Sequence, residues 1–366
     1  MGFKCGIVGL PNVGKSTLFN ALTQTALAQA ANYPFCTIEP NTGQVAVPDP
    51  RLDILAKLGK SAEIIPTQLT FVDIAGLVRG ASKGEGLGNQ FLAHIREVDA
   101  IIHVLRCFEN DDIMHVENRI DPIADAETVE TELMLADLDS LERRVDALSK
   151  KARGGDEEAK LRLALMQRVH EALKAGQPAR AVRVSGDELK AFRELQLLTA
   201  KPVLYVCNVE EAAAAAGNAY SAKVEARAKA ENAGCVVISA AIEAEVAHLT
   251  DPAERDAFLS DLGLTDTGLA RIIRAGYALL GLITFFTVGP KEARAWTVRK
   301  GARAPESAGV IHTDFERGFI RVETIAYDDF VSCGGELGAK EAGKLRLEGK
   351  DYVVQDGDVL HFRFNA

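Results

Sequence analysis

A glycine-rich segment near the start of the chain is the strongest indication of its fold. Residues Gly9 to Thr17 read Gly-Leu-Pro-Asn-Val-Gly-Lys-Ser-Thr and fit the pattern G-x-x-x-x-G-K-[ST]. An apolar run from Lys4 to Gly9 precedes the segment, and a helical stretch from Thr17 to Ala28 follows it. A turn between a strand and a helix offers backbone N–H groups and the positive end of the helix dipole to an anion. The sequence therefore predicts the phosphate-binding loop (P-loop) of a nucleoside triphosphatase.

Two further segments predict a magnesium site and a switch. We expect Lys15 to reach the β- and γ-phosphates and the hydroxyl of Ser16 to bind Mg²⁺. Asp73-Ile-Ala-Gly76 fits the D-x-x-G pattern of the G-protein branch, in which the aspartate holds Mg²⁺ through water and the glycine amide senses the γ-phosphate. Thr37, in a loop of turn residues, is a candidate third magnesium ligand.

The catalytic group is less clearly marked. Many members of this branch place a Gln after the D-x-x-G glycine to orient water, but this chain has Leu77. Either another residue supplies the polar group, or hydrolysis is slow. His115 follows a loop beyond a strand end, where nucleotides bind in such folds, and is either a catalytic residue or a loop residue with no chemical role.

The base-recognition segment departs from the GTPase pattern N-K-x-D. The matching place holds Asn208-Val209-Glu210-Glu211, so the lysine is replaced by valine and the aspartate by a longer glutamate. A displaced carboxylate pairs poorly with guanine, which favours ATP or relaxed specificity. Asn208 can still bond a purine edge, and Ser239 begins a turn expected to touch the base.

The remaining pattern predicts an α/β fold with an insertion and a second domain. Short apolar strands alternate with helices, which is typical of a parallel sheet. Between residues 121 and 200, Met134, Leu138, Leu141, Val145 and Leu148 form a heptad seam, and Leu161, Leu165, Val169 and Leu173 follow on a second helix. We expect a helical hairpin, either as a projecting arm or as a packed subdomain.

Beyond residue 280 the pattern changes to a small α+β domain. One short helix is expected at Ala308–Phe315. The five expected strands are Leu282–Thr287, Ala295–Val298, Gly318–Thr324, Asp351–Val354 and Val359–Phe364. We therefore predict a nucleotide-binding domain over 1–280, with the insertion at 121–200, and a second domain over 281–366.

Composition and charge indicate the cellular compartment and the class of partner. No run of 18 apolar residues is present, and the six cysteines include no CxxC pair, as in a cytoplasmic protein with reduced thiols. The net charge of −10 argues against a generic nucleic-acid binder.

In this order, the segments G-L-P-N-V-G-K-S-T, P-F-C-T-I-E-P-N, D-I-A-G-L, K-G-E-G-L-G-N-Q-F-L and N-V-E-E resemble the Obg-like ATPase (YchF) family over essentially the whole chain. The resemblance implies a Ras-like P-loop parallel sheet, a coiled-coil hairpin and a C-terminal β-grasp (TGS) domain. It implies that Asn12, Val13, Gly14, Lys15, Ser16 and Thr17 bind the phosphates, and that Asn208 and Val209 lie near adenine.

The resemblance also implies partners and cofactors. These are ATP or ADP, Mg²⁺ and the ribosome, with a possible RNA contact. We expect a cytoplasmic monomer in which the heptad seam closes on its own hairpin partner; the alternative is that it pairs between chains. Asn12 matches an asparagine that helps to bind a monovalent cation in related GTPases, which makes K⁺ a second candidate cofactor. Two alternatives stay open. One is a GTPase of the same fold in which Glu211 reaches guanine, and the other is a ribosome- or RNA-binding module with nucleotide as a structural ligand.

Overall fold

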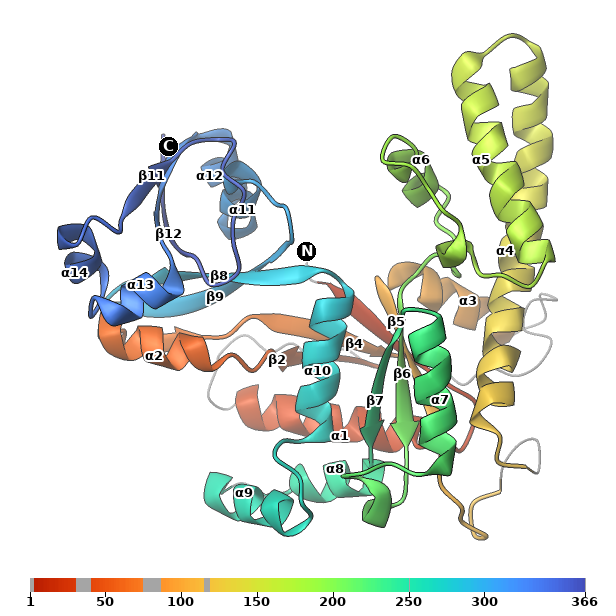
Figure 1. Ribbon diagram of the computed structural model, residues 1–366, viewed down its shortest axis with the longest axis horizontal. Helices are drawn as coiled ribbons and strands as arrows, with labels where there is room; N and C mark the ends of the chain where they lie inside the picture. The colour runs from red at the N-terminus through yellow and green to blue at the C-terminus, as the bar shows by residue number, and fades with distance from the viewer. Residues whose placement is uncertain (1–2, 31–40, 75–86, 115–118, 250, 366) are drawn as a thin grey trace. The chain divides into compact units, whose positions relative to one another are not determined.

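The computed structural model describes residues 3–30, 41–74, 87–114, 119–249 and 251–365. The chain forms two compact units, each described here by itself (Figure 1). The larger unit includes most of Met1–Ala28 and all of the described residues in Thr70–Ile272. The smaller unit combines Gln44–Leu69 with Ile273–Ala366. No helix among the described residues is long and apolar enough to cross a membrane.

The larger unit contains most of a six-stranded sheet with the strand order β2-β4-β1-β5-β6-β7. Strand β1 pairs in parallel with β4 and β5, and β6 pairs in parallel with β5 and β7. All seven residues of β5 are buried, as expected for a parallel strand covered on both faces. This confirms the predicted Ras-like sheet. Its strands are β1 (Lys4–Val8), β2 (Thr42–Ala46), β4 (Gln68–Asp73), β5 (Ala100–Arg106), β6 (Val203–Asn208) and β7 (Gly234–Ile238).

Helices follow most of these strands. Each parallel connection runs through at least one helix, which is the arrangement that parallel pairing requires. The helices are α1 (Lys15–Ala30), α3 (Leu87–Glu97), α7 (Ala219–Ala230), α8 (Ala240–Val246), α9 (Pro252–Asp261) and α10 (Gly268–Leu279).

The insertion forms the predicted hairpin from α4 (Pro122–Arg153) and α5 (Glu157–Lys174), followed by the short α6 (Leu189–Glu194). Asp121 caps α4 and Asp156 caps α5, each by accepting a hydrogen bond from a backbone N–H of the first turn. The heptad residues from Met134 to Leu148 pack with Leu165, Val169 and Leu173 in one cluster.

Leu161 was expected on the same seam, but its side chain is 74% exposed. A spacing of four residues advances about 40° around a helix at each step, because a turn holds 3.6 residues. After three steps back from Leu173, Leu161 has turned away from α4.

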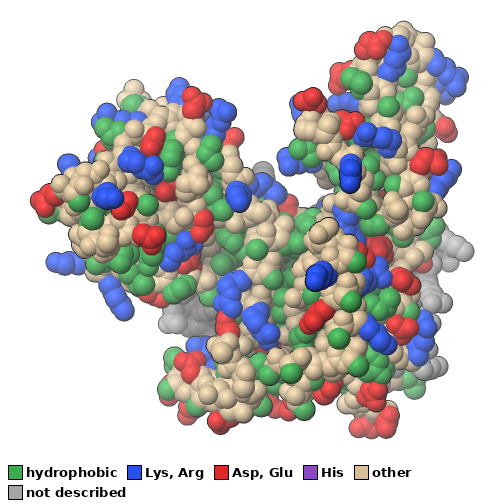
Figure 2. Space-filling view, viewed as in Figure 1, with side chains coloured by type: hydrophobic (Ala, Val, Ile, Leu, Met, Phe, Trp, Pro, Cys, Tyr) green, Lys and Arg blue, Asp and Glu red, His purple; other side chains and the backbone are tan. Residues whose placement is uncertain are grey.

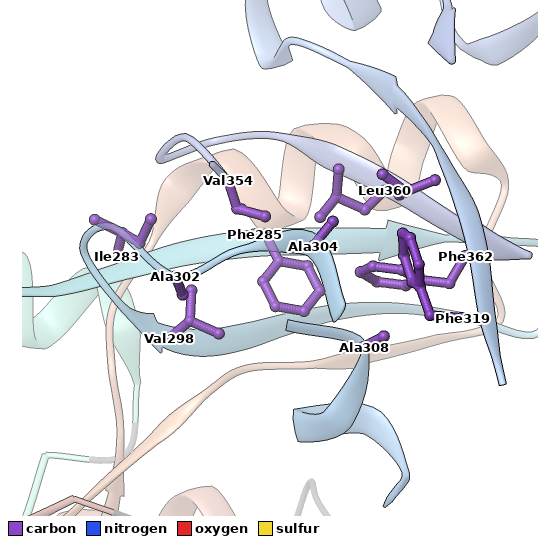
Figure 3. Packing of buried hydrophobic residues seen from close by; sticks show 11 residues of the cluster. Ile283, Phe285, Val298, Ala302, Ala304, Ala308, Phe319, Val354, Leu360 and Phe362 are labelled. Carbon is purple, nitrogen blue, oxygen red and sulfur yellow. The ribbon is translucent and has the colours of Figure 1, made fainter. Parts of the chain in front are cut away.

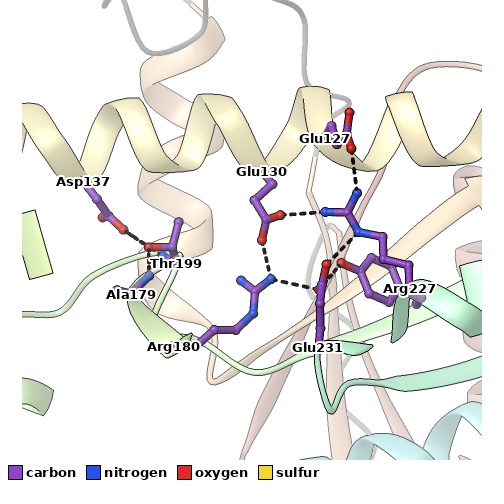
Figure 4. A network of polar contacts seen from close by, with 9 residues as sticks. Glu127, Glu130, Asp137, Ala179, Arg180, Thr199, Arg227 and Glu231 are labelled. Carbon is purple, nitrogen blue, oxygen red and sulfur yellow. Dashed lines mark hydrogen bonds and ion pairs between the residues drawn. The ribbon is translucent and has the colours of Figure 1, made fainter. Parts of the chain in front are cut away.

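A network of charged side chains joins the base of the hairpin to α7 (Figure 4). Glu130 of α4 forms ion pairs with Arg180 and, at 2.8 Å, with Arg227 of α7. Glu231 binds both arginines in turn and accepts a hydrogen bond from the hydroxyl of Tyr205 in β6. The network therefore connects the insertion to a helix and a strand of the nucleotide-binding sheet.

The smaller unit has a β-grasp arrangement in which the first and last long strands lie parallel and side by side. Its sheet has the order β11-β10-β12-β8-β9-β3, with β12 parallel to β8 and antiparallel to β10. Figure 3 shows Phe285, Phe319 and Phe362 packed with Ala304 and Ala308 of α11. The strands are β3 (Glu63–Ile65), β8 (Leu282–Val288), β9 (Glu292–Arg299), β10 (Phe319–Ile325), β11 (Arg346–Glu348) and β12 (Val359–Phe364). The helices are α2 (Pro50–Gly59), α11 (Ala304–Ile311), α12 (Thr313–Arg317), α13 (Tyr327–Ser332) and α14 (Glu336–Glu341).

Two predicted elements of this unit were wrong. The single helix over 308–315 is two helices, because His312 is extended and its ring nitrogen caps α12 by accepting from the N–H of Asp314. The strand over 351–354 is reduced to one bridge, Val353 with Arg303. There the carboxylate of Asp358 binds Gln355 N–H and the Tyr352 hydroxyl, which curls the segment.

Candidate nucleotide site

The P-loop connects β1 to α1 with two residues in left-handed backbone conformation, Asn12 (φ 64°) and Gly14 (φ 91°). A Cβ at Gly14 would lie 2.2 Å from Nδ2 of Asn208. A Cβ at Gly9 would lie 2.6 Å from the carbonyl oxygen of Val104. Both positions therefore need glycine, because a side chain of a neighbouring segment at Gly14 and a backbone carbonyl at Gly9 leave no room for a Cβ.

Lys15 and Asp73, predicted from separate motifs, meet in the structure. The ammonium of Lys15 lies 3.0 Å from Oδ1 of Asp73, and both side chains are largely buried. Lys15 is the first residue of α1, and Asp73 is the last residue of β4, which pairs with β1 in the sheet. Strand pairing thus brings the phosphate-binding cation next to the predicted magnesium carboxylate.

Asn208 fixes the P-loop to the segment that follows β7. Its Nδ2 donates to the carbonyl oxygen of Val13 (2.9 Å), and its Oδ1 accepts from the N–H of Ala240 (2.9 Å). The side chain is 5% exposed. Both ends of the amide are thus bonded to protein backbone, so Asn208 positions the P-loop and the turn after Ser239 relative to each other.

A cavity of about 900 Å³ opens at these elements. The P-loop lines one side, the loop after β5 another, and the segments after β6 and β7 the rest. Among the predicted binding residues, Val13 is buried and outside the lining, and those in the lining are Asn12, Gly14, Lys15, Ser16, Thr17, Asn208, Val209, Glu211 and Ser239. The cavity is therefore lined by residues from the phosphate-binding and the base-recognition segments alike.

Two carboxylates on the lining are held by the N-terminal end of α7. Asn218, the N-cap of α7, donates from Nδ2 to Oε2 of Glu210 (3.0 Å) and to the carbonyl oxygen of Cys107 (2.6 Å). The hydroxyl of Tyr220 donates to Glu109 (2.7 Å). The start of α7 thus fixes both acidic walls of the cavity.

Three predicted site residues lie outside the described residues: Thr37, Gly76 and His115, as does Leu77. Their roles stay predictions, as do those of the residues that line the cavity. The donors that the structure does describe fit Mg²⁺, which prefers oxygen ligands, because Ser16 offers a hydroxyl and Asp73 a carboxylate.

The sequence interpretation assigned no binding residue to the loop after β5, although Phe108, Glu109, Asn110 and Ile113 line the cavity. It also missed Arg106 and Asn218, which support the wall. No motif marks them. Their one signal is position, because they lie at or beyond the carboxyl ends of β5 and β6, where ligands bind in parallel sheets.

Comparisons with known proteins agree with this geometry. Residues 4–137 match a family described as 50S ribosome-binding GTPase, and residues 282–365 match the C-terminal domain of YchF-type GTPases, described as a protein of unknown function. The "ribosome-binding ATPase YchF" of Haemophilus influenzae is 61% identical over 366 residues, and that of Bacillus subtilis is 54% identical over 368, each covering 100% of both chains. A solved structure titled as the Schizosaccharomyces pombe YchF GTPase is 40% identical, with a TM-score of 0.90 over 99% of this chain and 98% of that one.

Proposed function

Since this chain belongs to the YchF family, we propose that it is a ribosome-binding ATPase that uses ATP binding and slow hydrolysis to ADP and phosphate as a switch. The observation that carries the proposal is the cavity shared by the P-loop and the segment Asn208–Glu211. That segment lacks the lysine and aspartate with which G proteins read guanine, and Val209 offers no side-chain hydrogen bond.

In this proposal the chain's own residues divide the work. Lys15 leaves Asp73 to bind the β- and γ-phosphates, and the backbone N–H groups from Asn12 to Thr17 surround them. Ser16, Thr37 and Asp73 would hold Mg²⁺, which when bound neutralises charge on the phosphates. His115 is the candidate catalytic residue in place of the glutamine missing at Leu77, and Asn12 is the candidate ligand of K⁺.

The proposed partner is the ribosome, bound in the cytoplasm by a monomer. The relatives are named for ribosome binding. Candidate RNA contacts are the basic residues at the end of α4 and those in and beside β9: Lys150, Lys151, Arg153, Arg294, Arg299, Lys300 and Arg303. On the face in Figure 2, Lys and Arg side chains lie among Asp and Glu side chains, which favours a local contact over broad electrostatic attraction.

Titration calorimetry of ATP against GTP, with Mg²⁺ present and K⁺ varied, tests the proposal. We expect ATP to bind at least about tenfold more tightly, a difference of about 1.4 kcal/mol. Lys15→Ala should abolish turnover, whereas Lys160→Ala, on an exposed face of α5, should not. Equal affinities or a preference for GTP would overturn the ATPase assignment and leave the fold unchanged.

Two alternatives are favoured by specific observations. Glu211 lines the cavity, and the yeast relative is titled a GTPase, which favours a GTPase in which this carboxylate reaches guanine. Leu77 favours a ribosome-binding module with nucleotide as a structural ligand. Cosedimentation with ribosomes separates the module from the switch, because only the switch loses nucleotide-dependent binding when Lys15 is replaced by Ala.

A further inference from the structure

Arg106, the last residue of β5, is an arginine in an unusual place. It is 2% exposed and follows six buried residues of β5, a strand in which all seven residues are buried. A buried guanidinium is costly unless its N–H groups are bonded. The bonds that Arg106 makes therefore indicate why an arginine stands at this position.

Its guanidinium bonds to one short loop. Nε donates to the carbonyl oxygen of Phe108 (3.2 Å), Nη1 to that of Ile113 (2.8 Å) and Nη2 to that of Asn110 (3.1 Å). The guanidinium also lies over the Phe108 ring, 4.6 Å from its centre. Phe108, Asn110 and Ile113 all line the nucleotide cavity, so one buried side chain holds three points of its wall.

The two ends of this loop are held by other residues. At its start, the N–H of Cys107 donates to the carbonyl oxygen of Asn208 (2.8 Å). At its end, Nδ2 of Asn12 donates to the carbonyl oxygen of Met114 (3.0 Å). The P-loop has its own support, since Asn208 binds the carbonyl oxygen of Val13. Arg106 therefore controls the middle of the wall and not the phosphate-binding loop.

We propose that Arg106 is a positioning residue of the nucleotide site: it fixes the wall from Phe108 to Ile113 against which the nucleoside part of the substrate binds. This inference rests on the proposed nucleotide-binding function. This positioning role requires an arginine, because the rigid fork of a guanidinium reaches three carbonyl oxygens at once. A lysine ammonium, in contrast, is a point donor on a flexible stem.

The matched variant is Arg106→Lys, which keeps a positive charge near Asp125, a buried residue in the first turn of α4 whose charge acts on Arg106. The control is Arg144→Lys in the hairpin, where Nη1 also donates to a backbone carbonyl oxygen, that of Leu195 (2.7 Å). Both variants lose hydrogen bonds from an arginine to backbone carbonyl oxygens, three at Arg106 and one at Arg144, but the bond lost in the control lies outside the cavity lining.

Three measurements test the inference: the affinities of ATP and of inorganic triphosphate by calorimetry, KM and kcat for ATP, and hydrogen exchange of residues 107–114. Arg106→Lys should weaken ATP binding about tenfold or more, the effect of losing one or two hydrogen bonds to the wall, with triphosphate affinity within about twofold. KM should rise more than kcat falls, and exchange should increase in the loop alone. Arg144→Lys should change none of these.

Unchanged ATP affinity with faster exchange over the whole chain would overturn the inference, because Arg106 would then support only the core. Equal losses for ATP and triphosphate would also overturn it, because the effect would lie in the P-loop. If the wild type prefers GTP, the ATPase proposal fails and the same comparison is made with GTP. If the wild type binds neither nucleotide, both proposals fall.

Discussion

His103, in the middle of β5, is an ionisable residue in a strand whose seven residues are all buried. The side chain is 4% exposed, its ring packs 5.8 Å from that of Tyr205, and its Nε2 has no hydrogen-bond partner among the described residues. Burial, with smaller contributions from the charges of Arg227 and Arg180, lowers the pKa of His103 from 6.5 to about 3. The ring is therefore neutral in the folded protein.

This predicts a pH-dependent stability. The pKa of His103 is lower in the folded than in the unfolded protein, so the neutral ring contributes fully to the free energy of unfolding above pH 6.5. This contribution is lost as the pH falls from 6.5 towards 3, because in that range only the unfolded chain takes up the proton. Between pH 7.5 and 5, the wild type should lose about 2 kcal/mol more unfolding free energy than His103→Leu. Urea unfolding at the two pH values measures this difference. Parallel losses in both proteins would mean that His103 is not the group responsible.

Single residues were predictable where a motif assigns a chemical role. Lys15 and Asp73 follow from two separate patterns, and sheet pairing brings them to 3.0 Å. Asn208 was predicted to lie near the adenine, and that stays a prediction; its side chain lines the cavity, and its amide binds two backbone groups of the protein. Arg106 carries no motif, because its three acceptors are carbonyl oxygens, which every residue has. A sequence cannot indicate which carbonyl groups a side chain will reach.

Between elements, the charged network that joins α4 to α7 should contribute to the free energy of unfolding. Replacing Glu130 by Gln leaves Arg180 and Arg227 with one fewer carboxylate in a site where all three side chains are less than a fifth exposed. We expect a loss of about 1–3 kcal/mol in unfolding free energy, measured in urea, between the values for exposed and for buried pairs.

The matched control for Glu130→Gln lies on the same helix. Asp139 pairs with Arg143 at 2.7 Å, but these side chains are 69% and 74% exposed. Asp139→Asn should therefore cost less than about 0.5 kcal/mol. Equal effects of the two variants would show that the network adds nothing beyond an ordinary surface pair.

Elements with a strong period were predictable, and short ones were not. The heptad seam of the hairpin and the buried strands of the parallel sheet appear as expected, because their burial repeats along the sequence. The helix α2 and the three-residue strand β3 were missed. Apolar residues of α2 are buried, and those of β3 partly buried, by partners more than 200 positions away, and no local pattern reveals such a partner.

The packing of α2 and β3 against residues beyond 280 affects how the whole chain divides into domains. Leu52, Leu55 and Ala56 of α2 pack in one cluster with Phe286, Ala295 and Phe330. Arg51 binds Asp356 at 2.7 Å, and β3 pairs in parallel with β9. The boundary at residue 280 stays a prediction about domains, but the smaller unit uses a segment from either side of it.

A fragment of residues 1–280 should therefore be defective even though it retains the whole P-loop. It keeps α2 and β3 but lacks the strands and helices that bury them, so the side chains of Leu52 and Leu55, 4% and 0% exposed in the intact chain, would face water. We expect the fragment to bind the dye anilinonaphthalene sulfonate and to aggregate on heating, because exposed apolar patches associate.

Within the full chain, Leu55→Ala should lower the free energy of unfolding by about 2–5 kcal/mol, whereas Ile54→Ala, at a neighbouring position that is 40% exposed, should lower it by less than about 1 kcal/mol. A fragment that binds no dye and melts like the full chain, together with equal effects of the two substitutions, would show that 1–280 folds on its own and that α2 is only an attachment. The opposite result would place the folding boundary within the segment around residues 44–69 as well as at residue 280, since the smaller unit would then depend on both parts of the chain.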